Sequence, residues 1–136
     1  MNTSNNTTVE TKTLNPSLTQ PLVIDALVSL VFGAALVLWS DKLASLIGIE
    51  PFQIVHWLGW GVLAFATFVG VLVVPPKQRR VGTVKILVIA NALWSIAALG
   101  IVIAAPLGLN GWGLFGVGLT GVFTAVMGWW EYRLLE

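Results

Sequence analysis

The sequence contains no cysteine, a single histidine and very few charges. Without cysteine, this chain cannot form disulfides, bind metals through thiolates, hold an iron–sulfur cluster or use a thiol nucleophile. Only 10% of its residues are charged, whereas a soluble domain carries about a quarter. With 57% hydrophobic residues and a mean hydropathy of +0.89, the chain has too little polar surface to cover itself in water. The composition therefore predicts a membrane protein.

Four long apolar stretches follow a polar N-terminal segment. Residues 1–21 are rich in Asn, Thr and Ser, and we expect them to form a disordered cytoplasmic tail. Each apolar stretch is close to the roughly 20 residues that cross a bilayer as a helix. The predicted spans cover residues 22–39, 52–74, 81–105 and 112–130. All six prolines lie in the tail or between the spans. We predict an all-α fold, a four-helix transmembrane bundle over residues 22–136.

The segment between the first two spans, residues 40–48, has the pattern of a short helix. Ser40 can cap its start, Asp41 suits the positive end of the helix dipole, and Gly48 can end it. Three of its apolar side chains fall on one face, so we expect a short interfacial helix on the outer surface.

The distribution of positive charge predicts the orientation. With four crossings, six of the seven Lys and Arg residues lie on one side and only Lys42 lies on the other. The six are Lys12, Lys77, Arg79, Arg80, Lys85 and Arg133. Since Lys and Arg collect on the cytoplasmic side, we expect a multi-pass protein of the cell (inner or plasma) membrane with both termini in the cytoplasm.

Small residues on two of the spans indicate how the helices pack. In lipid, close approach through small side chains drives helix association. Candidate packing positions are Ala66, Gly70, Gly116, Thr120, Gly121, Thr124, Ala125 and Gly128. Four of them, from Gly116 to Gly128, repeat every fourth residue. This face can serve packing within one chain or contact between copies of the chain.

The sequence offers no convincing catalytic set. His56 is the sole histidine, and Glu50 and Asp41 are expected on the same outer side, which makes the three a weak candidate metal site. We predict no metal and no cofactor. A Ser–His–Asp relay and a phosphate-binding glycine loop are both missing from the pattern, so we do not expect an enzyme.

Polar residues inside the predicted spans are costly in lipid and therefore indicate a role. Asp25 and Ser29 share one helical face, and Asn91, Trp94 and Ser95 share another. Asp25 and Asn91 lie at the same depth, each about 22 Å below the outer end of its helix. We therefore expect these two side chains to face each other inside the bundle.

The segments around Asp25 and Asn91 are alike, reading Asp-Ala-Leu-Val-Ser-Leu and Asn-Ala-Leu-Trp-Ser-Ile. Together with the common depth, this suggests a tandem repeat of two helix pairs. Lys85 is the cation nearest in depth to Asp25, although it lies about 120° around its helix from Asn91, and we expect Glu131 to point inward beneath Thr124. The hypothetical ligand-binding set is Asp25, Ser29, Lys85, Asn91, Trp94, Ser95 and Glu131. Two interpretations stay open: hydrogen bonds that pin the helices together, or a small ligand pocket or proton-linked site.

Three segments resemble those of small four-helix bacterial membrane proteins of the broad DoxX-like type. They are Asp-Lys-Leu-Ala-Ser-Leu-Ile-Gly-Ile at 41–49, Asn-Ala-Leu-Trp at 91–94 and the terminal Trp-Trp-Glu-Tyr-Arg-Leu-Leu-Glu. The resemblance covers residues 22–136. It implies an association with respiratory or redox complexes and quinones, but no catalytic residue or quinone site is carried over.

The sequence thus predicts a small integral membrane protein that acts as a structural or accessory component. We expect it to associate with itself or to join a larger membrane complex. The alternative is a small transporter, or a protein that binds a lipophilic ligand such as a lipid or quinone through the polar cluster. The lipid bilayer is the expected environment, and nucleic acid is not an expected partner.

Overall fold

The structure, a computed structural model, describes residues 15–74, 81–105 and 108–135. Four of its helices are long and apolar enough to cross a membrane. They are α1 (Thr19–Leu38), α3 (Gln53–Val73), α4 (Val81–Ala104) and α5 (Gly111–Arg133). A 3₁₀ turn (Pro16–Leu18) precedes α1, and the short helix α2 (Ser40–Ile47) follows it. The described residues contain no strand, and the predicted four-helix transmembrane bundle is confirmed.

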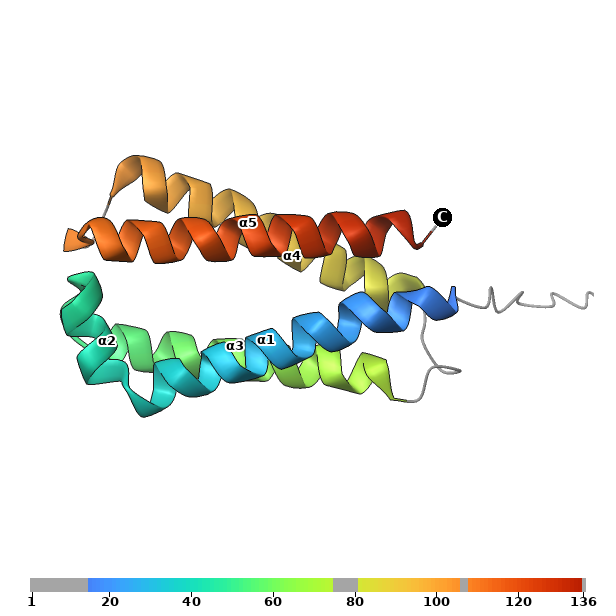
Figure 1. Cartoon of the computed structure of the whole chain (residues 1–136), viewed down its shortest axis with the longest axis horizontal. Coiled ribbons are helices and arrows are strands. Elements are labelled where there is room, and N and C mark those ends of the chain that lie inside the picture. The colour runs from blue at the N-terminus through green and yellow to red at the C-terminus, as the bar shows by residue number, and fades with distance from the viewer. Residues whose placement is uncertain (1–14, 75–80, 106–107, 136) are drawn as a thin grey trace, which may run out of the picture.

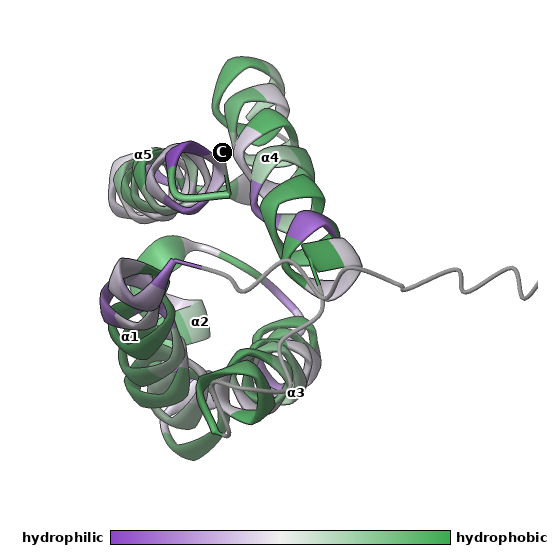
Figure 2. Cartoon of the chain, turned by 90° about the vertical axis from the view of Figure 1, so that its right-hand side faces the viewer, coloured by the Kyte–Doolittle hydropathy of each residue, from purple (hydrophilic) through white to green (hydrophobic). Residues whose placement is uncertain are grey.

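The four long helices form two antiparallel hairpins, α1 with α3 and α4 with α5 (Figure 1). Viewed along the bundle, the helices stand at the corners of a rough square, with α5 next to α1 (Figure 2). Since α1 and α4 run in the same direction, the start of α1 and the end of α5 lie at one end of the bundle (Figure 1). Helix α2 lies at the opposite end and contacts both hairpins.

The buried apolar core is divided between the two ends of the bundle. At the end where α1 begins, one cluster joins α1, α3 and α4 through Leu22, Val69 and Leu87. At the other end, a second cluster joins α1, α2 and α3 through Leu36, Ala44 and Val55. The remaining outer faces are strongly apolar (Figure 2). Because lipid solvates these faces, the bundle needs only a thin protein core.

Each hairpin contains a glycine within one helix at which the other helix of the pair approaches very closely. A Cβ atom added to Gly59 of α3 would lie 2.9 Å from Leu36 Cβ of α1. A Cβ atom added to Gly121 of α5 would lie 2.7 Å from Ala98 Cβ of α4. Both distances are below ordinary van der Waals contact. Glycine at these two positions is therefore what allows each pair of helices to approach.

The structure corrects two of the predicted element boundaries. Helix α1 begins at Thr19, so the segment assigned to the tail, 1–21, is too long at its C-terminal end. Residues 1–14 lie outside the described residues, and so do four of the six Lys and Arg residues that predict the orientation, Lys12, Lys77, Arg79 and Arg80. Helix α5 continues to Arg133, three residues beyond the predicted span, because polar residues can prolong a helix past its apolar stretch.

The short helix after α1 forms as predicted, although its start differs. Ser40 is the first helical residue and Trp39 occupies the cap position, with no side-chain cap bond. Gly48 ends α2 in the left-handed conformation, with a φ of 80°. That conformation suits glycine because a side chain there is strained. The predicted cap by Ser40 is therefore wrong, and the predicted glycine ending is confirmed.

Candidate functional site

Three buried polar side chains, Asp25, Asn91 and Glu131, meet where the two hairpins come together. We call these three residues, together with Ser29, Ser95 and Thr124, the polar junction. Asp25 of α1 and Glu131 of α5 are fully buried, and Asn91 of α4 is 1% exposed. The Asn91 amide nitrogen, Nδ2, donates to Asp25 Oδ2 and to Glu131 Oε2, both at 3.2 Å. One amide thus bridges two carboxyl groups and ties three helices together.

Three hydroxyl groups complete the polar junction. Ser29 Oγ, one turn along α1, donates to Asp25 Oδ1 at 3.3 Å. Ser95 Oγ lies 2.8 Å from both the Asn91 carbonyl oxygen and Thr124 Oγ1 of α5. The Ser95–Thr124 bond joins α4 to α5 one turn away from Asn91. The junction is therefore a short ladder of polar contacts along the inner faces of α1, α4 and α5.

A glycine on α5 brings the amide and the carboxyl group within reach of each other. A Cβ atom added to Gly128 would lie 3.2 Å from Asn91 Cβ, so the α5 backbone passes close to the Asn91 side chain. Glu131 follows Gly128 by three residues and shares its helical face. The close passage at Gly128 thus places the Glu131 carboxyl group over the Asn91 amide.

The predicted contact between Asp25 and Asn91 is confirmed, and Ser29, Ser95 and Glu131 join them. The predicted inclusion of Lys85 in the cluster is wrong: its side chain is exposed. The buried side of α4 runs through Val84, Leu87 and Asn91, and Lys85 falls off this side. Trp94 is half-buried on α4, and no hydrogen bond links it to the junction in the described part of the chain.

The predicted packing positions divide into two groups. Ala66, Gly121 and Gly128 are buried, and Thr124 bonds to Ser95. In contrast, a Cβ atom added to Gly70 or Gly116 would meet nothing within 4 Å. Ala125 is exposed, and the half-buried Thr120 donates its hydroxyl hydrogen to a carbonyl of its own helix. The predicted packing at Gly70, Gly116 and Ala125 is therefore wrong within a single chain.

The weak candidate metal ligands lie at the far end of the bundle from the junction. Among the described residues, Asp41, Glu50 and His56 do not come together as a group that could hold a metal ion. His56 Nε2 accepts a hydrogen bond from Trp60 Nε1 at 3.2 Å. Asp41 and Glu50 line an open depression of about 730 Å³ between α2 and α3.

Asn110 makes structural hydrogen bonds but is not among the predicted site or packing residues. Its side chain accepts from the Gly113 backbone N–H at 3.0 Å and so caps the start of α5. The same side chain donates to the Leu46 carbonyl oxygen at 2.7 Å, at the end of α2. Its own backbone N–H donates to the Ile47 carbonyl oxygen. Asparagine is a preferred N-cap residue, so its position before α5 is the sequence signal that marks it.

Comparison with protein-family models, curated proteins and solved structures finds no match. The resemblance to DoxX-like proteins therefore stays a prediction. The described geometry offers a carboxyl–amide–carboxyl bridge, hydroxyl groups that support it, and a histidine at the opposite end. The bridge and its hydroxyl groups can hold the helices together, and its carboxyl groups can bind or release a proton.

Proposed function

We propose that this chain is a small, non-enzymatic membrane protein that assembles with copies of itself or with a larger membrane complex. One observation carries the proposal. The buried polar groups form hydrogen bonds between helices of the same chain, whereas small residues on an outer face of α4 contact no other helix in the part of the chain that the structure describes. Gly100 and Ala104 of α4 are both exposed, and a Cβ atom added to Gly100 would meet nothing within 4 Å. Small residues four apart allow a neighbouring helix to approach closely in lipid.

The resemblance to DoxX-like proteins supports respiratory or redox complexes as the larger assembly. The polar junction supports a structural role, since its three central side chains are at most 1% exposed. A reactive group in a membrane enzyme has to meet its substrate, and these side chains face one another instead.

Native mass spectrometry after mild detergent extraction tests the assembly. We expect species heavier than the 14.6 kDa monomer, either multiples of the chain or complexes with other subunits. Gly100→Leu should reduce these species, because the larger side chain holds a neighbouring helix away from α4. Gly61→Leu is the matched control, since Gly61 is also exposed with open space around it but lies on α3. A purely monomeric protein without co-purifying subunits would contradict the proposal.

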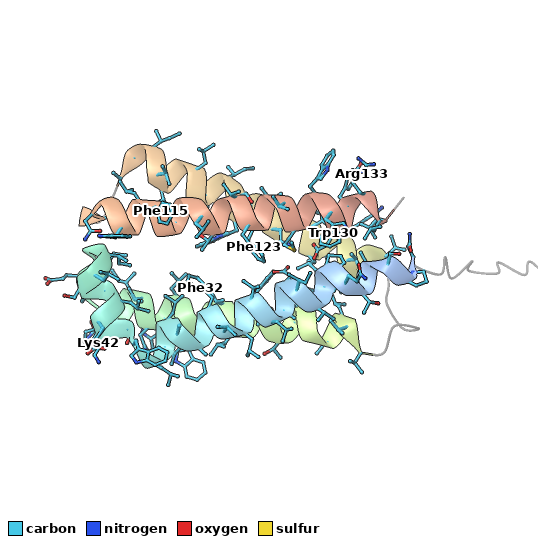
Figure 3. The ribbon with its side chains drawn as sticks, viewed as in Figure 1. Phe32, Lys42, Phe115, Phe123, Trp130 and Arg133 are labelled. Carbon is cyan, nitrogen blue, oxygen red and sulfur yellow. The ribbon has the colours of Figure 1, made fainter. Side chains whose placement is uncertain are left out.

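A second candidate function, binding of a lipid or another lipophile, is favoured by aromatic side chains between the hairpins. Figure 3 shows Phe32 of α1 and Phe123 of α5 directed toward the opposite hairpin. Phe32 nevertheless remains 39% exposed, so the protein does not seal it on all sides. An acyl chain or quinone tail can pack against such a ring. The same mass spectra would show this ligand as a bound mass that Phe32→Ala removes.

We also propose that both termini lie in the cytoplasm. Ser17, before α1, and Ser45, in α2, are both exposed and lie at opposite ends of the bundle. Because the chain has no cysteine, Ser17→Cys and Ser45→Cys each introduce a single thiol in a similar side chain. A membrane-impermeant maleimide should label Ser45→Cys in intact cells and Ser17→Cys only after permeabilisation. The reverse pattern would overturn the orientation.

A further inference from the structure

The polar junction contains more hydrogen-bond acceptors than donors. Asp25 and Glu131 present four carboxyl oxygens between them. Three of these accept a bond, two from Asn91 Nδ2 and one from Ser29 Oγ. The fourth, Glu131 Oε1, is buried and has no partner. A buried oxygen left without a donor is costly, and much more so if it carries part of a negative charge.

No positive charge of the described residues enters the junction. Apart from Asp25, α1 has no charged residue, and the only titratable side chain of α3 is His56, at the opposite end of the bundle. On α4, Lys85 is exposed. On α5, Arg133 is exposed and its guanidinium group lies 5.9 Å from the centroid of the Trp129 ring. Tyr132 is also exposed, and the half-buried residues after it are leucines.

Two ionised carboxylates that share one amide, are buried and have no cation among the described residues would repel each other where no water screens them. We propose that the junction is a proton-binding site, in which Glu131 holds one proton at neutral pH and Asp25 is the charged partner. The assignment to Glu131 follows from the bonds: Asp25 accepts two, whereas Glu131 accepts one and has an unpartnered oxygen. A neutral carboxyl group tolerates that unpartnered position better than a carboxylate does.

The proton exchanges with water at the end of the bundle where α5 ends. Glu131 is two residues from the last residue of α5, so its path to that surface is short. Loss of the proton places two negative charges on either side of the Asn91 amide and drives α1 away from α5. Proton binding thereby strengthens the contact between the two hairpins. The folded chain holds a proton that the separated carboxyl group would release at neutral pH, so stability falls as pH rises.

Infrared spectroscopy of the full chain in lipid vesicles tests the site, because a protonated carboxyl group has a carbonyl band distinct from that of a carboxylate. At neutral pH we expect this acid band in the native protein and in Asp25→Asn. Glu131→Gln should reduce it to background, since glutamine is neutral and nearly isosteric. The absence of an acid band from the native protein at neutral pH would overturn the proposal. So would a band that Asp25→Asn removes and Glu131→Gln retains.

Thermal unfolding in detergent provides a second measurement that does not depend on the infrared assignment. The native protein should lose thermal stability as the pH rises from mildly acidic to alkaline, because folding has to take up a proton that becomes scarcer. Glu131→Gln, which has no proton to lose, should show a smaller loss over the same range. An equal loss in both proteins would contradict the site. The exposed charges that titrate in this range are common to both proteins and cancel in the comparison.

Discussion

Replacing Asn91 with leucine is expected to lower the free energy of unfolding by about 2–4 kcal/mol. The substitution removes the bonds to Asp25 and Glu131, each worth roughly 0.6 kcal/mol on average and up to about 1.7 in membrane proteins. It also leaves Glu131 without any donor, because its other oxygen already has none. A buried polar group that loses its partner costs about 1–3 kcal/mol more. Chemical or thermal unfolding of the purified protein in detergent measures the change.

A matched control removes a polar group that has no partner on another helix. Thr67 is exposed on α3 and donates only to the Leu63 carbonyl oxygen of its own helix, so Thr67→Val should change stability by less than about 0.5 kcal/mol. Replacing Asp25, Asn91 and Glu131 together with leucine should restore much of the loss, because apolar packing can substitute for a buried polar network. If Asn91→Leu is as mild as Thr67→Val, the junction does not hold the hairpins together.

Replacing Gly121 with alanine is expected to destabilise the α4–α5 hairpin by about 1–3 kcal/mol, the usual cost of inserting an atom into a packed interface. The new Cβ would lie 2.7 Å from Ala98 Cβ, so the two helices have to move apart. That movement also weakens the contacts of Thr124 and Glu131, which follow Gly121 along the same face. The midpoint of thermal unfolding should fall accordingly.

Gly116→Ala provides the control in the same helix. A Cβ at Gly116 meets nothing within 4 Å, and alanine is favoured over glycine inside a helix by up to about 1 kcal/mol. This variant should therefore be neutral or slightly more stable than the native chain. Equal destabilisation by both substitutions would show that the close approach at Gly121 is not what limits the interface.

The level of a residue along the bundle could be predicted from the sequence, and so could the face that it shares with others on its helix. The neighbour that each face meets could not. Counting residues to the C-terminal ends of their helices placed Asp25 and Asn91 at one level, and the structure joins them by a hydrogen bond. The same counting also favoured Lys85, which is exposed. The two outcomes differ because Lys85 lies about 120° around α4 from Asn91, so it shares the level of the polar junction but not its face.

The stripe of small residues on α5 shows the same limit. Positions spaced by four drift around a helix, because four residues exceed one turn of 3.6. Gly116 lies five residues before Gly121, which places it about 140° around α5 from Gly121. It therefore leaves the contact with α4. The actual contact alternates steps of three and four residues, through Gly121, Thr124, Gly128 and Glu131. A sequence with many small residues is consistent with several such lines, and only the partner helix selects one.

The sequence by itself determined that this is a membrane protein with four spans and a short helix after the first. These properties are local: they depend on how many apolar residues follow one another and on where proline, glycine and charge interrupt them. The tertiary structure alone decided that Asn91 bridges two carboxyl groups, that Lys85 stays outside and that Asn110 links α2 to α5. Lipid solvates every apolar face equally well, so hydrophobicity does not select the partners. Close approach at glycines and hydrogen bonds between distant helices do.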